Sequence, residues 1–312
     1  MSMEQNSSLG GFILLGFSDK PQLEIILFVL ILVFYILNLV GNMTIILVSS
    51  IDPRLHTPMY FFLTNLSFVD LCLTTTVAPQ LLLTMRSKEK TMSYIGCVAQ
   101  LYVAVGLGST ECILLVVMAY DPVCRPLHYA VIMHPQLCLS LAATAWLSGF
   151  VISVIQCSLT IQLPMCGHNQ LDHICCEVPV LIRLACVDTT FNEAELFVVS
   201  VVFLILPVSL ILVSYGYIAQ AILRIKSASG RHKAFGTCSS HLVVVIIFYG
   251  TIIFMYLQPV KSKFKDQGKF VSLFYTVVTP LLNPLIYTLR NKDVKGALRK
   301  LVLEKILVSE KL

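Results

Sequence analysis

Seven long apolar runs, separated by short polar segments, take up most of this 312-residue chain. They cover residues 23–50, 58–85, 93–120, 137–160, 194–225, 235–257 and 270–289. A helix of about 20 apolar residues crosses a membrane, so each run is long enough to span one. Pro79, Pro207, Pro280 and Pro284 lie inside the runs and predict kinks, because neighbouring helices can satisfy the carbonyls that they free. The pattern predicts an all-α membrane protein, a single domain (1–312) with a seven-transmembrane helix bundle.

Seven spans place the two ends of the chain on opposite sides of the bilayer. The excess of Lys and Arg in alternate segments favours an extracellular N-terminal tail (1–22) and a cytoplasmic tail (290–312). Asn6 opens an Asn-Ser-Ser sequence, which is a glycosylation acceptor in an outer tail. Val294, Leu298 and Leu301 alternate with basic residues, a pattern that predicts a short amphipathic C-terminal helix on the inner leaflet.

Composition and motifs exclude several classes of protein. Only 12% of the residues are charged, against about 25% in soluble domains. The net charge of +5 includes no basic cluster dense enough to bind nucleic acid. The sequence contains no nucleophile elbow, no HExxH and no phosphate-binding glycine loop, so we expect neither an enzyme nor a cofactor. Cys238 and His241 share a helix face, which is more typical of packing than of a nucleophile.

Polar residues inside the apolar runs predict a buried cluster. In the third run, Ala104, Gly108 and Glu111 share one helix face, which cannot face lipid because an ionised carboxylate there costs several kcal/mol. The polar residues at comparable depth are Asn42, Ser67, Asp70, Glu111 and Asn283. Two hypotheses follow: a site at Asp70 and Glu111 for a cation such as sodium, or a hydrogen-bonded network that only fixes helix packing.

Five cysteines lie at the outer end of the third run or in the following outer loop: Cys97, Cys166, Cys175, Cys176 and Cys186. Cysteines clustered in an oxidising space predict disulfides, and their odd number leaves one thiol free. The connectivity does not follow from the sequence. A zinc site with His168 and His173 is the competing interpretation, although the spacing matches no common zinc pattern.

Several longer motifs identify a family. They are GN at 41–42, LHTPMYFFL at 55–63, MAYD at 118–121, SY at 214–215, KAFGTCSSH at 233–241, PLLNPLIY at 280–287 and LRNK at 289–292. Together they resemble the olfactory receptors, a branch of the rhodopsin-like G-protein-coupled receptors, and the resemblance covers nearly the whole chain.

The resemblance implies a plasma-membrane receptor with an extracellular N-terminus, an outer pocket for small volatile, mostly apolar ligands, and signalling through a heterotrimeric G protein. It implies the disulfides Cys97–Cys176 and Cys166–Cys186, with Cys175 as the free thiol. The implied ligand-binding residues are Ala104, Val105, Gly108, Ser109, Cys112, Val199, Ser200, Phe203, Tyr249, Ile252, Ile253, Tyr256, Leu273 and Thr276. The implied G-protein face contains Asp121, Tyr215, His241 and Tyr287.

The chemistry of that pocket set suggests a class of ligand. It is mostly apolar, with hydroxyls at Ser109, Ser200, Thr276 and two tyrosines that could select a carbonyl or an alcohol. Burial contributes about 25 cal/mol per Å² of apolar area, so a small odorant would bind weakly and with low selectivity. No buried positive charge lies on these faces, so a carboxylate ligand is disfavoured.

One segment departs from the family pattern. The family continues MAYD with Arg-Tyr-Val-Ala, whereas here Pro122 follows Asp121 and the segment is three residues short. Pro122 lacks an N–H and disfavours helical geometry at Asp121, and the arginine that would reach the G protein is missing. We therefore expect impaired coupling, and a signalling-defective or decayed receptor is one alternative. A transporter or channel is another, although no internal repeat supports it.

Overall fold

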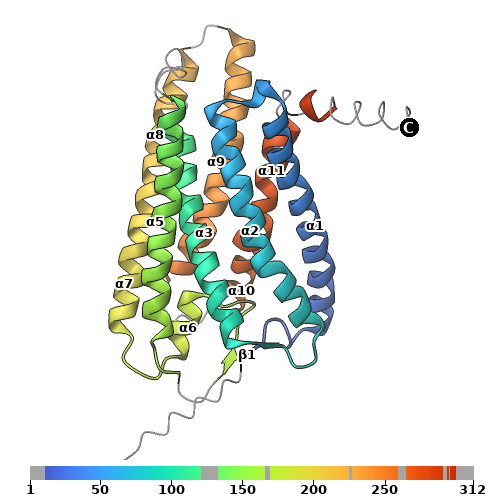
Figure 1. Cartoon of the computed structure of the whole chain (residues 1–312), viewed down its shortest axis with the longest axis vertical. Helices are drawn as coiled ribbons and strands as arrows, with labels where there is room; N and C mark the ends of the chain where they lie inside the picture. Colours follow the sequence, from blue (N-terminus) through green and yellow to red (C-terminus); the bar gives the residue numbers. More distant parts are fainter. Residues whose placement is uncertain are drawn as a thin grey trace, which may run out of the picture.

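The computed structural model describes residues 11–120, 133–165, 169–224, 227–258, 265–290, 294 and 296–299. Its long helices form an elongated bundle (Figure 1). The first four are α1 (Pro21–Ile51), α2 (Pro58–Arg86), α3 (Tyr94–Tyr120) and α5 (Pro135–Ile161), with a short 3₁₀ turn, η1 (Pro53–Leu55), between α1 and α2. The fifth is built from α7 (Thr190–Ser200), η2 (Val201–Ile205) and α8 (Leu206–Leu223). The sixth is α9 (Ala228–Tyr256), and the seventh joins α10 (Lys265–Leu273), η3 (Phe274–Val278) and α11 (Thr279–Arg290).

The seven-helix fold predicted from the apolar runs is confirmed. Among the described residues, six helices are long and apolar enough to cross a membrane, and Leu242–Tyr256 of α9, the sixth helix in chain order, is a shorter apolar helix. Large apolar side chains such as Val40, Leu147 and Val213 are exposed on the bundle surface. In a bilayer these side chains contact lipid, because lipid tails are as apolar as the side chains themselves.

Two of the four predicted kinks coincide with π-helical segments. In η2 the N–H of Leu206 donates to the carbonyl of Val201, and in η3 the N–H of Thr279 donates to the carbonyl of Phe274. In each case the next residue is a proline, whose ring clashes with the carbonyl four residues earlier. The wider turn relieves that clash, and such π-bulges often occur at functional sites.

Small residues let the helices approach closely at two crossings. A Cβ atom on Gly41 of α1 would lie 2.8 Å from Cβ of Pro284 in α11. A Cβ atom on Gly149 of α5 would overlap Thr110 of α3. Near the second crossing, the Ser153 hydroxyl of α5 donates a 2.6 Å hydrogen bond to the carbonyl of Tyr102 in α3. Interfaces of this kind are typical of membrane helices, where close van der Waals packing replaces the hydrophobic effect.

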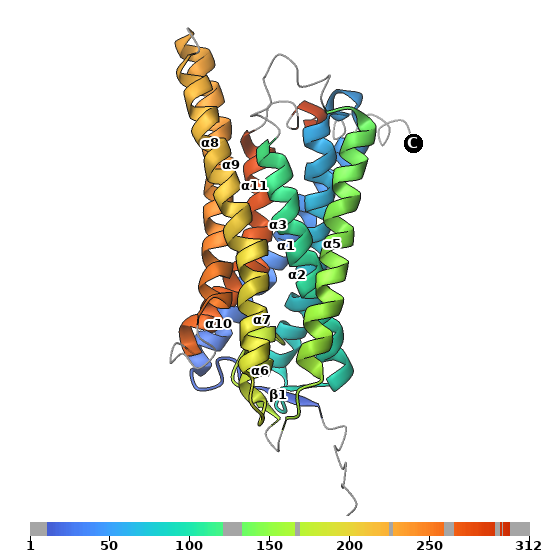
Figure 2. The same ribbon diagram turned by 90° about the vertical axis from the view of Figure 1, so that its left-hand side faces the viewer.

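One end of the bundle is covered by a small lid. It is defined here as strands β1 (Phe12–Leu14), β2 (Thr91–Met92) and β3 (Gln170–Leu171), helix α6 (Val178–Leu184) and residues 172–177 between β3 and α6. Strand β1 lies between the other two, antiparallel to β2 and parallel to β3. Figure 2 shows α6 and β1 at the end of the bundle that also holds α7 and α10. Part of the tail expected at residues 1–22 is therefore a structured component of the lid, and α1 begins at Pro21.

The described parts of the two chain ends lie at opposite ends of the bundle. Strand β1 is at the lid end, and helical residues 296–299 lie at the other end (Figure 1). Val294 and Ala297 are buried, so this short C-terminal segment packs against the protein with its apolar side. The glycosylation acceptor Asn6 and the remainder of the predicted amphipathic helix lie outside the described residues.

Candidate ligand cavity and polar core

A cavity lies between the helices, next to the lid; it measures about 860 Å³ when the space that opens to solvent is included. Side chains from α2, α3, α5, α7, α9 and both π-helices form its walls, and Cys175, Cys176 and Glu177 form its lid side. The lining is mostly apolar, and none of the described residues that line it is a lysine or an arginine. Its composition fits a site for a small molecule, since such pockets are mostly apolar and contain a few polar groups.

Most of the ligand-binding residues proposed from the sequence line this cavity. They are Ala104, Val105, Gly108, Ser109, Cys112, Val199, Ser200, Phe203, Ile252, Tyr256 and Thr276. Three others do not line it. Tyr249 is fully buried and donates a hydrogen bond to the Cys112 carbonyl, Leu273 packs in a cluster with Ile31 and Ala78, and Ile253 packs against the main core.

The cavity also contains polar residues that the sequence analysis did not assign to it. Gln100, Gln156, Glu177 and Tyr275 all line it. The two glutamines lie inside apolar runs, which is a signal that could have identified them, whereas Glu177 lies in a loop whose position depends on the fold. The Gln156 side chain is buried, and its amide lies close enough to Glu195 of α7 to interact with that carboxylate.

Two hydroxyl groups in the cavity wall donate their protons to backbone carbonyls of their own helices. The Ser200 hydroxyl donates to the Leu196 carbonyl at 2.7 Å, and the Thr276 hydroxyl donates to the Ser272 carbonyl at 2.5 Å. While each proton is directed to the backbone, these two oxygens can accept a hydrogen bond from a ligand.

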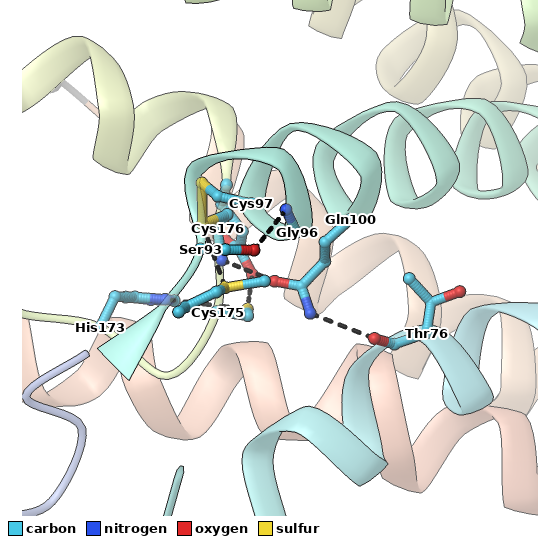
Figure 3. The surroundings of a disulfide bond; sticks show 10 residues. Thr76, Ser93, Gly96, Cys97, Gln100, His173, Cys175 and Cys176 are labelled. Carbon is cyan, nitrogen blue, oxygen red and sulfur yellow. Dashed lines mark hydrogen bonds between the residues drawn. A yellow bond between two sulfur atoms is a disulfide. The ribbon is translucent and has the colours of Figure 1, made fainter. Parts of the chain in front are cut away.

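A disulfide between Cys97 and Cys176 fixes the lid to the outer end of α3, with their Cα atoms 5.5 Å apart (Figure 3). Gln100, one turn further along α3, accepts a 2.9 Å hydrogen bond from the backbone N–H of Cys176 and donates a 3.2 Å bond to the carbonyl of Thr76. Cys186 is also disulfide-bonded, and its expected partner Cys166 lies outside the described residues. These links hold the lid over the cavity.

Beside the disulfide, the lid carries a cluster of His173, Cys175 and Glu177, all buried. One carboxylate oxygen of Glu177 accepts hydrogen bonds from the Cys175 thiol, at 3.1 Å, and from the Tyr275 hydroxyl. Burial raises the pKa of the Cys175 thiol well above its usual value, and the charge of Glu177 adds to that effect. Burial lowers the pKa of His173, so its ring is neutral at pH 7.

Further from the lid, a polar core joins α1, α2 and α11. Asn42 donates a 3.2 Å hydrogen bond to the carbonyl of Pro280, and Asn38, which the sequence analysis did not select, donates a 3.1 Å bond to Thr74. Asn283 donates a 2.8 Å bond to Asp70. These residues are fully buried, so the hydrogen bonds offset the cost of placing polar groups in an apolar interior.

This network is incomplete on the side of Glu111. Both carboxylate oxygens of Glu111, one oxygen of Asp70 and the Ser67 hydroxyl have no hydrogen-bond partner among the described residues. The charges of Glu111 and Asp70 are close enough to interact. Two fully buried carboxylates with free oxygens can hold a cation or share protons, because bare negative charge at this depth is costly.

The residues expected to face the G protein are only partly described. Tyr215 lies on α8 and is half-buried. His241 and Tyr287 lie on α9 and α11, but their side chains are outside the described part of the chain, and so is Asp121. The shortened segment after Asp121 is likewise outside the described residues.

Seven membrane helices around an apolar cavity, with a disulfide-fixed lid over it, define the class of seven-helix membrane receptors. Comparison with known proteins narrows this class. The family model described as "Olfactory receptor" matches residues 31–305. Human olfactory receptor 2G6 is 75% identical over 306 residues, with 97% of each chain covered. Mouse olfactory receptor 2C1 is 60% identical over 305 residues, covering 97% of this chain and 98% of the relative.

The chain belongs to the olfactory receptor family. It is therefore a signalling receptor of the G-protein-coupled class and has no role as an enzyme. It is a multi-pass protein of the plasma membrane. The family resemblance predicted from the motifs is confirmed over most of the chain.

Proposed function

We propose that this receptor detects small, mostly apolar odorants that carry a hydroxyl group and bind in the cavity beneath the lid. The observation that carries the proposal is the cavity lining: it is mostly apolar, and the Ser200 and Thr276 hydroxyls, whose protons are directed to backbone carbonyls, present oxygens that can accept a hydrogen bond from a ligand. An alcohol can donate to these oxygens, whereas a ketone or an ether cannot. The Glu177 carboxylate, with no lysine or arginine among the described lining residues, disfavours a carboxylate odorant.

A matched panel of odorants tests this ligand class. The panel contains an alcohol, a ketone and a carboxylic acid on the same carbon skeleton. It is applied to cells that express the receptor with Arg-Tyr-Val-Ala in place of Pro122, with cyclic AMP as the readout and surface expression measured by antibody staining. We expect the alcohol to be the most potent, and its advantage over the ketone to fall in Ser200→Ala, which removes one acceptor. Equal potency of alcohol and ketone would contradict the proposal.

We also propose that coupling to the heterotrimeric G protein is impaired in the native sequence. Pro122 occupies the position where the family has an arginine, and proline disfavours a helical conformation at Asp121. Without the arginine, a charged contact to the G protein and to the inner ends of the fifth and sixth helices is lost. Arg125 lies beyond the proline, so it is not a direct replacement in sequence position.

A repaired receptor, in which Arg-Tyr-Val-Ala replaces Pro122, tests the coupling proposal. It is compared with the native chain in a cyclic-AMP assay at equal surface expression. We expect a clear response to an active odorant from the repaired receptor and a weak response or none from the native one. Equal responses would show that the missing arginine does not matter.

The core around Asp70 and Glu111 supports a further proposal, that these carboxylates bind a sodium ion. The support is the set of free oxygens on Asp70, Glu111 and Ser67, which are hard ligands of the kind sodium prefers. The test is the thermal unfolding midpoint of purified receptor in sodium chloride and in choline chloride. We expect sodium to raise the midpoint of the native chain but not that of Glu111→Gln, and equal effects on both would contradict a sodium site.

A further inference from the structure

Glu177 is a lid residue whose carboxylate is only partly satisfied. It lines the cavity, only 5% of its surface is exposed, and its Oε2 atom has no hydrogen-bond partner among the described residues. Its Oε1 atom accepts hydrogen bonds from the Cys175 thiol, at 3.1 Å, and from the Tyr275 hydroxyl. Both donors are neutral groups, so they leave the negative charge of the carboxylate uncompensated. A buried carboxylate oxygen without a partner is costly, and a ligand that supplies a donor removes that cost.

The positive groups at the lid end do not take the place of such a ligand. None of the described residues that line the cavity is a lysine or an arginine. Lys269 forms an ion pair with Asp172 at 2.6 Å. Arg183 of α6 interacts electrostatically with Glu177, but it is exposed and lies outside the lining, where water screens its charge. Burial lowers the pKa of His173, so its ring is neutral at pH 7 and adds no positive charge.

Aromatic side chains surround the same cavity. Phe203, Phe248, Tyr256 and Tyr275 all line it. The charge of Glu177 reaches both tyrosines, so these two rings lie at the Glu177 side of the cavity. The face of an aromatic ring attracts a cation, and the attraction is strongest where water is excluded. A cation that pairs with Glu177 would therefore have aromatic neighbours as well.

A protonated amine meets the requirements of this corner of the cavity. An alkylamine resembles the lysine side chain, whose pKa is about 10.4, so it is a cation at pH 7. An alcohol can donate a hydrogen bond to Oε2 of Glu177, but it leaves the charge in place. An ammonium group donates the hydrogen bond and also neutralises the charge, and hydrogen bonds between ionised partners are about twice as strong as neutral ones. The apolar part of the lining then accommodates the alkyl chain.

We propose that Glu177 anchors the ammonium group of small primary alkylamines in the cavity, which makes these amines a second class of ligand beside the alcohols. This inference rests on the proposed function, because it places both classes in the same cavity. The carboxylate and the neighbouring aromatic rings select the charge of the ligand. The Ser200 and Thr276 oxygens select its hydrogen-bond donors, which amines and alcohols share.

The test compares three ligands with the same six-carbon chain: hexylamine, hexan-1-ol and hexanamide. Hexanamide has N–H donors but no charge, so it separates the effect of charge from that of hydrogen bonding. Binding to purified native full-length receptor in detergent is measured by the rise in the thermal unfolding midpoint with ligand concentration, because a ligand of the folded state stabilises it. We expect hexylamine to bind more tightly than either neutral ligand.

Glu177→Gln removes the charge and keeps an oxygen that can accept from Tyr275. We expect it to weaken hexylamine binding about 10- to 100-fold, the usual effect of losing a hydrogen bond to a charged group, and to change hexan-1-ol binding much less. Glu193→Gln is the matched control, because Glu193 lies on α7 outside the lining and accepts a hydrogen bond from Thr189. It should bind hexylamine like the native chain. Glu177→Asp keeps the charge and should retain part of the preference for the amine.

The comparison of ligands on the native chain needs no variant, so a folding defect in Glu177→Gln does not remove the test. Hexylamine binding no tighter than hexanamide binding would overturn the ammonium site, and so would equal loss in Glu177→Gln and Glu193→Gln. If hexan-1-ol binds and hexylamine does not, the ammonium site fails while the proposed alcohol function stands. If hexylamine binds through Glu177 and hexan-1-ol does not bind, the ammonium site stands and the alcohol function fails.

Discussion

The hydroxyl of Tyr249 donates a 2.7 Å hydrogen bond to the backbone carbonyl of Cys112. Both residues are buried, and the bond joins α9 to α3 where Cys112 forms part of the cavity wall. A ligand in the cavity therefore lies next to a contact that must change if α9 moves relative to α3. The receptor can then adopt two arrangements, one with α9 as described here and one in which α9 has moved relative to α3. A ligand that binds the second arrangement more tightly would shift the equilibrium toward it.

Tyr249→Phe is expected to raise basal signalling in the repaired receptor. The change removes one buried hydrogen bond, worth about 1 kcal/mol. The population of the arrangement in which α9 has moved relative to α3 should therefore rise about fivefold. Basal cyclic AMP at equal surface expression measures the effect. Tyr102→Phe is the control, because its hydroxyl bonds Ser158 across α3 and α5 and does not involve α9. An equal rise in both variants would show that the Tyr249 bond has no special role.

Gly41→Ala is expected to destabilise the bundle. The new methyl group would overlap the rigid ring of Pro284, and overpacking of this kind typically costs about 1–3 kcal/mol. The thermal unfolding midpoint of purified receptor should fall. At Gly250, by contrast, an added Cβ meets no atom within 4 Å, so Gly250→Ala should leave the midpoint unchanged or raise it. If Gly41→Ala were as stable as the native chain, the close approach of α1 and α11 would be in doubt.

Cys97→Ser is expected to lower the amount of receptor at the cell surface. The Cys97–Cys176 disulfide closes a sequence separation of 79 residues, and losing a disulfide usually costs about 2–5 kcal/mol. Surface staining relative to total protein measures the loss. Cys72→Ser, which removes a free thiol, should match the native chain. Normal surface levels of Cys97→Ser would mean that the sheet of β1, β2 and β3 holds the lid without the disulfide.

The helices were predictable because each apolar run is long enough to cross the hydrocarbon core of a membrane. The strands of the lid were not, because they have only two or three residues and show no period that a sequence pattern can reveal. The pairing of Ile13 with Thr91 and Gln170 joins three distant segments. Such contacts depend on the completed fold.

For the cavity residues, too, regular helical segments were easier to predict than irregular ones. The α3 residues that the family resemblance assigned to the pocket, among them Ala104, Gly108 and Cys112, follow one another at intervals of four on a regular helix and line the cavity. In the seventh helix the resemblance assigned Leu273 and Thr276; Thr276 lines the cavity together with Tyr275, whereas Leu273 does not. Both lining residues lie in η3, where the wider π-turn changes which side chains share a face, and a 3.6-residue period does not anticipate that change.

A ligand bound in the cavity between α3, α7 and α9 is expected to produce the signal. A Cβ atom on Gly108 of α3 would meet no atom within 4 Å, and Gly108 lines the cavity, so Gly108→Leu should fill that space without disturbing the fold. Gly216→Leu is the matched control, because Gly216 lies on the exposed face of α8 and also has open space around it.

The decisive measurement is the cyclic-AMP response of the repaired receptor to an active odorant, compared among the unsubstituted form, Gly108→Leu and Gly216→Leu at equal surface expression. We predict that Gly108→Leu loses the response and Gly216→Leu retains it. A full response from Gly108→Leu would contradict the claim that the odorant binds in this cavity.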